Sequence, residues 1–469
     1  MKRTLVVALC TLSLVAAACG ASGTDEAEEN GENGTETTAA PNGDGEAMFG
    51  DLELPCGEGD ASVAEGEGPS TDTLLLGVAN DRTADIRPGL NKELWDTSVA
   101  FADWCNEQGG IQGLEIELVD LDGALLNVEA AMTEACDGVF AMVGGAYAQD
   151  QFIFSGNPGS DFHRCGLIAI PAFAVSVEFS GANGKVEPIP NPADRVATQW
   201  IVDLVEQFPD EAESMVVVRG ESPSFDSVEA QFRAAAEAAG VELAPTVSYP
   251  IIGADDWGPF ADLVIDGGAE VAYWIGEPTN AAQMNQQLVQ KNWGGIMLHQ
   301  TNAYDEVLFD SGPAAVEGAV VRTGFHPFEE RDEWPALDQY YQVMERAPDA
   351  KIAALGLQSM SSWLLFAVAA DECATLNDGV IDRTCVLEQA AAVEEWTAGG
   401  LHIPTDPGSG EAPECGMLLV VRDGEFERLT PELGGDQDDG AGFHCPEDSV
   451  VDTDTSGLAD GNVDPDRPI

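Results

Sequence analysis

The chain has 469 residues, and its 84 acidic and 19 basic side chains give a formal net charge of −65. This charge excludes a nucleic-acid-binding protein, because a phosphate backbone needs a basic surface. Hydrophobic residues make up 44% of the chain, which is enough for a buried core and argues against general disorder. At roughly 100–200 residues per domain, the length predicts two or three folded units.

The first residues have the pattern of an export signal. Met1, Lys2 and Arg3 form a basic start, residues 5–15 are apolar, and three alanines precede Cys19. We expect residues 1–18 to be a lipoprotein signal peptide and Cys19 to carry the lipid. Two acyl chains would then hold the protein on the extracellular face of the cell membrane. An ordinary secretory signal is the alternative, and it also predicts export.

Both ends of the mature chain are acidic. Residues 20–72 carry 15 acidic side chains and no Lys or Arg, so we expect an acidic disordered tether over residues 19–72. Residues 429–469 hold 11 acidic residues and one arginine, which predicts an acidic C-terminal tail. Residues 452–460 match the first positions of a calcium loop, but Val463 stands where a bidentate Glu belongs. We therefore predict neither a metal nor a cofactor.

Eight cysteines remain when Cys10 and Cys19 are set aside. An even number in an exported chain predicts disulfides, and the lack of a CxxC motif argues against zinc. Cys373 and Cys385 flank a short polar loop, and Cys415 and Cys445 flank a loop rich in Gly and Asp. Cys136 ends a predicted helix close to the strand that Cys165 begins, which leaves Cys56 with Cys105. The expected pairs are Cys56–Cys105, Cys136–Cys165, Cys373–Cys385 and Cys415–Cys445.

Strands and helices alternate in two successive blocks. Runs typical of buried strands occur at residues 73–79, 114–121, 139–144, 167–170, 214–218, 243–248, 270–275 and 296–299. Helical spacing occurs at residues 91–107, 128–136, 227–239, 257–265, 281–291, 334–346 and 353–370. Residues 417–425 resemble a hairpin. The apolar run 363–370 is too short to cross a bilayer and predicts a buried helix.

This alternation predicts an α/β protein with two doubly wound parallel-sheet lobes joined by a hinge. The proline-rich residues 183–194 are the hinge candidate, and residues 319–325 would cross back. Ligands of such sheets bind beyond the carboxyl ends of the strands. We expect lobe 1 to comprise residues 73–190 and 323–395, and lobe 2 to comprise residues 191–322 and 396–428.

Four segments carry a family resemblance. They are the strand LGVAND at residues 76–81, the helix end NEQGGIQG at 106–113, the strand IELVDLD at 116–122, and VFAMVGG at 139–145. Their glycines allow the positive φ of a helix stop and tight turn. This region resembles the first lobe of type I periplasmic solute-binding proteins, the Leu/Ile/Val-binding family of ABC transporters. The likeness extends more weakly to about residue 425.

The resemblance implies a binding protein that closes on a small amino-acid-like ligand, such as a branched-chain amino acid, and delivers it to a permease. In the family, ligand contacts come from loops after strands. Glu277 directly follows the strand at 270–275 and is the expected ammonium partner, although a solvated loop acid is the alternative. The candidate ligand-binding residues are Asn80, Asp81, Arg82, Tyr147, Ala148, Gln149, Phe173, Ala174, Ser224, Phe225, Glu277, Asn302 and Tyr304.

Two features leave alternatives open at this site. The four candidate aromatic residues could form the ligand wall or belong to the core. The serine and threonine that the family shows in the first-lobe loops are absent here, so an amide, urea-like or acidic ligand is a second possibility. The expected partners are a small-molecule ligand, an ABC permease and the membrane through the lipid anchor. We expect a monomer that binds no nucleic acid.

Two other classes of function compete with transport. A secreted hydrolase needs a nucleophile or metal motif, but neither GxSxG nor HExxH occurs. We therefore do not expect an enzyme. A lipid-anchored lobe that senses ligand for a signalling system would have the same fold.

The acidity is not confined to the ends. The stretch from residue 73 to 428 holds 58 acidic and 16 basic residues. Such a surface repels itself in dilute salt, and counter-ions screen the repulsion. We predict adaptation to a salty exterior, so the melting temperature should rise as NaCl is increased toward molar concentration. A melting temperature that stays level or falls across a calorimetric salt series would contradict this prediction.

Overall fold

The protein is described by a computed structural model that covers residues 48–53, 55–155 and 161–467. The chain separates into two units, Met1–Gly45 and Glu46–Ile469, and every described residue belongs to the second. The predicted signal peptide, Cys19 and the first part of the predicted tether therefore lie outside the described residues. Among the helices that are described, none combines the length and apolar character needed to cross a membrane.

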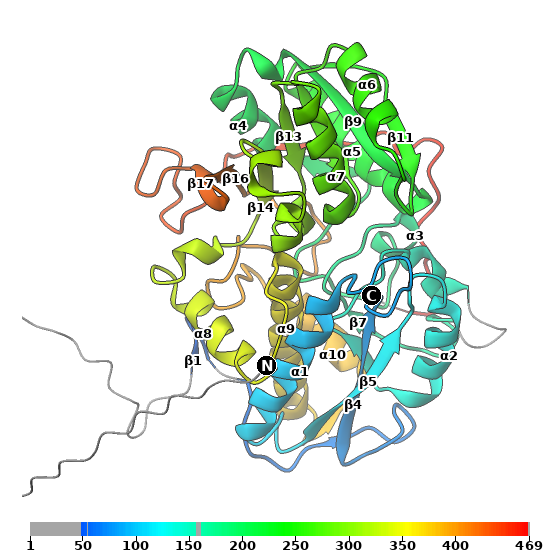
Figure 1. Cartoon of the computed structure of the whole chain (residues 1–469). Helices are drawn as coiled ribbons and strands as arrows, with labels where there is room; N and C mark the ends of the chain where they lie inside the picture. The colour runs from blue at the N-terminus through cyan, green and yellow to red at the C-terminus, as the bar shows by residue number, and fades with distance from the viewer. Residues whose placement is uncertain (1–47, 54, 156–160, 468–469) are drawn as a thin grey trace, which may run out of the picture. The chain divides into compact units, whose positions relative to one another are not determined.

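A four-stranded parallel sheet has the strand order β5–β4–β6–β7. Its strands are β4 (Thr73–Asn80), β5 (Glu115–Asp122), β6 (Ala141–Val143) and β7 (Ala169–Ile170). Alternate residues of β4 point to opposite faces. Leu76 packs in one cluster with side chains of α1 (Lys92–Glu107) and α9 (Ala354–Leu376), whereas Ala79 packs with α2 (Val128–Gly138). Helices thus cover both faces of the sheet (Figure 1).

The second sheet has eight strands in the order β10–β9–β12–β13–β14–β16–β17, with β11 also paired to β9. It is parallel through β14, and β16 and β17 add antiparallel strands at one edge. The strands are β9 (Ser214–Glu221), β10 (Glu242–Leu243), β11 (Val247–Pro250), β12 (Val271–Ile275), β13 (Ile296–His299), β14 (Val320–Thr323), β16 (Met417–Arg422) and β17 (Glu425–Thr430).

Helices also cover both faces of this second sheet (Figure 1). Val216 and Val218 of β9 pack with α6 (Gly258–Asp266) and α7 (Pro278–Gln290). Met215 and Val217, which alternate with them, pack with α4 (Gln199–Gln207) and α5 (Asp226–Ala238). The remaining α-helices of the described residues are α3 (Val177–Ser180), α8 (Pro335–Met344) and α10 (Arg383–Ala391).

The α/β fold class with two parallel sheets is therefore confirmed, and the predicted hairpin is β16 and β17. The single strand predicted at residues 243–248 is instead the two strands β10 and β11. Pro245 lies between them, and proline cannot donate a hydrogen bond to a strand ladder. The hinge candidate at residues 183–194 lies between α3 and β8 (Arg195–Ala197) and contains no helix or strand of its own.

The prediction of a disordered tether is wrong for the described residues from Met48 to Asp72. They contain β1 (Met48–Phe49), β2 (Leu52–Glu53) and β3 (Ser62–Val63), and β3 pairs with β15 (Val380–Ile381). Phe49 is fully buried and packs edge-on against Trp104. The prediction failed because it relied on the acidic average composition of the segment and not on its few apolar residues, such as Phe49.

The prediction of a solvated acidic tail is also wrong. β18 (Val450–Asp452) pairs with β8, and the backbone N–H of Asn462 donates to the Glu178 carbonyl. Several acidic side chains here stabilise turns. Asp438 accepts hydrogen bonds from the backbone N–H groups of three glycines, at 2.6–2.8 Å. These contacts lower the pKa of Asp438.

Four disulfides cross-link the fold, and they join the same four pairs that the sequence predicts: Cys56–Cys105, Cys136–Cys165, Cys373–Cys385 and Cys415–Cys445. Cys56 ties the amino-terminal segment to α1, and Cys445 ties the carboxy-terminal segment to the chain that enters β16. Both acidic ends are therefore held covalently to the folded unit.

Candidate ligand-binding site

A cavity of about 270 Å³, here called the main cavity, lies beyond the carboxyl ends of strands from both sheets. Phe173 and Ala174 line it from the loop after β7, and residues 276–277 and 300–302 line it from the loops after β12 and β13. Arg322 and Thr323 at the end of β14 complete one wall. This is where parallel α/β sheets place their ligands, since the strands all end at the same edge.

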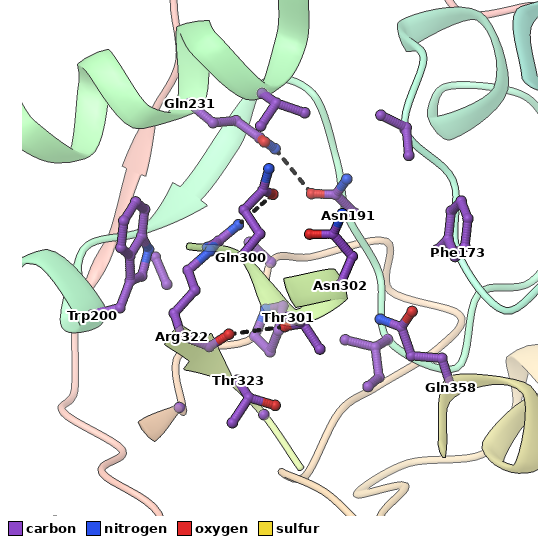
Figure 2. A pocket seen from close by; sticks show the side chains of 18 of the residues that line it. Phe173, Asn191, Trp200, Gln231, Gln300, Thr301, Asn302, Arg322, Thr323 and Gln358 are labelled. Atoms are coloured by element: carbon purple, nitrogen blue, oxygen red, sulfur yellow. Dashed lines mark hydrogen bonds between the residues drawn. The ribbon is translucent and has the colours of Figure 1, made fainter. Parts of the chain in front are cut away.

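Amide side chains dominate the polar lining. Figure 2 shows Asn191, Gln300 and Asn302 between Trp200 on one side and Phe173 on the other. Gln231 donates to the side-chain oxygen of Asn191 at 3.1 Å. Because an amide can both donate and accept hydrogen bonds, the lining suits a polar ligand with both kinds of group. The seven amide residues of the lining are Asn91, Asn191, Gln199, Gln231, Gln300, Asn302 and Gln358.

Asn302 and Gln358 differ in whether their side-chain amides find hydrogen-bond partners in the protein. The Asn302 amide donates to the Gly276 carbonyl at 3.0 Å, so this hydrogen bond fixes the loop that follows β13. The side-chain oxygen of Gln358 on α9 is buried and accepts no hydrogen bond from the described residues. An orphaned buried acceptor costs free energy unless a donor reaches it. Gln358 is therefore a candidate acceptor for a ligand N–H.

Glu277 supplies the one acidic group of the lining that has no ion-pair partner among the described residues. It follows β12 and precedes α7, but its side chain does not cap that helix. Burial raises the pKa of Glu277 to about 7, and the nearby Arg87 opposes this rise. A half-buried carboxylate without a protein partner is well suited to bind a cationic group.

A buried ionic cluster lies beside Glu277. The amino group of Lys351 is 2.9 Å from a Glu93 oxygen and 2.6 Å from an Asp305 oxygen. All three, with Glu277, line a second cavity of about 70 Å³. Glu93 belongs to α1 on the first sheet, whereas Asp305 follows β13 of the second. Burial alone would lower the pKa of Lys351, but the two carboxylates outweigh it and raise the pKa.

Six of the residues predicted from the sequence line the main cavity. They are Ala148, Phe173, Ala174, Phe225, Glu277 and Asn302. Two of the four candidate aromatics are thus at the cavity. Tyr147 and Tyr304 are buried in the core: the Tyr147 hydroxyl donates to the Leu121 carbonyl at 2.8 Å, and Tyr304 packs against Phe328 and Phe426.

The structure places the other predicted residues away from the lining. Asp81 is fully buried, and its carboxylate accepts hydrogen bonds from the backbone N–H groups of Leu125 and Ala148 at 2.7 and 2.8 Å. Asp81 therefore positions the loop that carries Ala148. Asn80 donates to Asp120, and Arg82 forms an ion pair with the same residue at 2.6 Å.

Gln149 and Ser224 make hydrogen bonds outside the main cavity. The Gln149 amide donates to the Leu125 carbonyl at 3.1 Å, and the Ser224 hydroxyl donates to the Gln151 side chain at 2.7 Å. Neither residue lines the main cavity. Gln149 joins two loops of the first sheet, whereas Ser224 joins the loop after β9 of the second sheet to the segment after β6 of the first.

A family model described as periplasmic binding protein matches residues 179–425. This chain belongs to the periplasmic binding protein family. The match confirms the resemblance found in the sequence, and it covers the second sheet up to the start of β17, the cavity loops after β12 and β13, and α9. No match to a curated protein was found.

Solved structures show the same fold for this periplasmic binding protein. A leucine-binding protein from Thermotoga maritima has 16% identity and a TM-score of 0.62, with 76% of this chain and 98% of that one covered. A fatty acid ABC transporter substrate-binding protein from Thermomonospora curvata has 16% identity and a TM-score of 0.63, covering 82% and 97%. An ABC transporter substrate-binding protein from Aeropyrum pernix has 15% identity and a TM-score of 0.63, covering 80% and 97%.

The sequence did not indicate several lining residues of this binding protein. Arg322 lies within the apolar run of β14, where an isolated basic residue was the only signal. Gln300 directly follows β13, so a polar residue at a strand end could have identified it. Trp200 and Gln358 come from helices, and only the packing of α4 and α9 brings them to the cavity.

We predict that replacing Lys351 by Met lowers the free energy of unfolding by roughly 3–5 kcal/mol near pH 8, since two buried carboxylates lose their counter-charge. The loss should be smaller at pH 5. Burial already raises the pKa of Glu93, and removal of the cation raises it further, so protonation of Glu93 on acidification relieves the repulsion. The exposed Lys291, which pairs with Asp262 at 2.6 Å, gives the control. Lys291→Met should cost no more than about 1 kcal/mol in urea denaturation, and equal losses for both variants would contradict the prediction.

Proposed function

We propose that this periplasmic binding protein binds a small amino-acid-like ligand in the main cavity and delivers it to an ABC permease. The observation that carries the proposal is the Glu277 carboxylate, which lines the cavity and has no ion-pair counter-charge among the described residues, because Arg87 and Lys351 act on it only from beyond ion-pair distance. A ligand ammonium group would supply that charge. Charge-assisted hydrogen bonds of this kind are shorter and stronger than neutral ones.

The size and lining of the cavity support a small polar ligand. Its volume of about 270 Å³ is near the lower limit for small-molecule sites. Phe173 and Phe225 supply apolar wall, while the amides of Asn302 and Gln358 supply hydrogen-bonding groups. The names of the solved relatives include both a leucine and a fatty acid binder, so the ligand class rests on this lining and not on the fold.

An amide or urea-type solute is the alternative, and the seven amide side chains of the lining favour it. Such a ligand would exchange paired hydrogen bonds with Asn and Gln and would not need an ionised Glu277. Ligand contacts come from both sheets in either case, so binding would favour the arrangement in which the two sides approach each other.

We further propose that Cys19 carries a lipid anchor that keeps the binding protein at the membrane, close to its permease. Three small residues before a cysteine, after an apolar run, support this proposal. A Cys19→Ser variant should lose the lipid and be recovered in the medium or the soluble extract. Retention of this variant in washed membranes would contradict the anchor.

Calorimetric titration of the full chain tests the role of Glu277. Glu277→Gln should weaken the affinity for an amino acid by about tenfold to a hundredfold, since a hydrogen bond to a charged group contributes about 1.5–3 kcal/mol. For the wild type, affinity should fall as pH drops below about 7, because the raised pKa of Glu277 leaves it neutral there.

Glu270 gives the matched control, because it is exposed and precedes the opposite end of β12. Glu270→Gln should leave the affinity unchanged. Unchanged affinity in Glu277→Gln would count against the ammonium site. A melting temperature that responds to amides or ureas, but to no amino acid, would favour the alternative ligand.

A further inference from the structure

Arg322 is a cationic group at the cavity that no protein carboxylate neutralises within the described residues. Its guanidinium lies over the Trp200 ring at 4.3 Å from the centroid, and one nitrogen donates to the Gln300 side chain over a long 3.4 Å. Figure 2 shows this side chain extending from β14 into the space near Gln300 and Trp200. It also lies beside the hydroxyl of the buried Tyr273. A guanidinium has five N–H donors, so several remain for a ligand.

The absence of an acid beside Arg322 is informative because the chain is so acidic. Nine arginines of the described residues lie within 3.1 Å of an Asp or Glu oxygen. Arg383 has no such acid, but four backbone carbonyls accept its hydrogen bonds. Arg87 and Arg467 also have no ion-pair partner among the described residues, but neither of them lines the main cavity. Arg322 does line it and has neither kind of compensation, in a chain of 84 acidic residues. Its charge is therefore left for something that enters the cavity.

Arg322 and Glu277 lie at separate places in the cavity. Tyr273, Leu298 and Val320 are neighbours across β12, β13 and β14. Two strand spacings separate β12 from β14, roughly 10 Å. Glu277 is four residues beyond Tyr273, in the loop past the end of β12, whereas Arg322 is two residues beyond Val320 and still within β14. Glu277 therefore also lies further along the strand direction. The cations that act most strongly on Glu277 are Arg87 and Lys351.

The ammonium and carboxylate of an α-amino acid are attached to the same carbon atom, so we do not expect this pair of groups to reach both residues. We propose that Arg322 binds a second carboxylate, at the end of the ligand's side chain, and that the ligand class is the acidic amino acids. This inference rests on the proposed function. Phe225 and Val228 also line the cavity, and they would contact the aliphatic part of such a ligand. The planar guanidinium matches a carboxylate in a two-point hydrogen bond.

A comparison of isosteric ligands on the unaltered protein gives the first test. Calorimetric titrations would use L-glutamate, L-2-aminoadipate, L-glutamine and L-leucine. We expect at least one acidic amino acid to bind ten times more tightly than L-glutamine, which has the size of L-glutamate without its side-chain charge. Tighter binding of L-glutamine or L-leucine would overturn the inference. No binding of any of the four would overturn both the inference and the proposed function.

The second test is Arg322→Gln, with Arg422→Gln as its control. Arg422 ends β16 in the same sheet, but its side chain is exposed and pairs with Glu427. We expect Arg322→Gln to reduce acidic-ligand affinity at least tenfold and to bring L-glutamate and L-glutamine within threefold of each other. Arg422→Gln should preserve the discrimination. Melting of each ligand-free variant checks that it is folded.

The two proposals fail in different ways. Binding of a neutral amino acid that depends on Glu277, but not on Arg322, would retain the proposed function and overturn the acidic ligand class. Undiminished L-glutamate affinity in Arg322→Gln would also overturn it. Should Arg322→Gln fail to fold, the comparison of L-glutamate with L-glutamine on the unaltered protein decides the question alone.

Discussion

The ion pairs of Lys351 join parts of the chain that belong to different sheets. Glu93 comes from the helix that packs on the first sheet, Asp305 from a loop of the second, and Lys351 from the segment that enters α9. Two buried carboxylates without a cation would be strongly unfavourable. Neutralisation of Glu93 and Asp305 by Lys351 therefore requires the two sheets to hold their positions relative to each other. Glu277 lines the same small cavity, so a charged ligand bound there would change the electrostatic energy of this cluster.

The fold followed from periodicity because apolar runs and helical spacing are properties of neighbouring residues. Residues 73–79 and 270–275 predicted β4 and β12 almost to the residue. The average composition of residues 48–72 gave a wrong prediction of disorder, because a few residues determine the structure of that segment. One buried aromatic, Phe49, and one cysteine, Cys56, fix a segment that is otherwise acidic and rich in glycine.

The site was only partly predictable for a related reason. A position after a strand identifies residues near the cavity, which sufficed for Glu277 and Asn302. It does not say whether a side chain faces the cavity or satisfies its own loop, as Asp81 does for the N–H groups of Leu125 and Ala148. Nor does it find Trp200 and Gln358, because their placement depends on how whole helices pack.

The pairing of β18 with β8 has a consequence for how binding could be observed. Arg195, Val196 and Ala197 of β8 line the main cavity, and their backbone is hydrogen-bonded to residues 450–452. The chain then continues to the first sheet, where Asn183 donates to the carbonyls of Asp464 and Arg467 at 2.8 Å. Residues 450–467 thus link the cavity wall at β8 to the segment around Asn183 that packs beside the first sheet. A spectroscopic label along this segment would register cavity occupancy without touching the ligand.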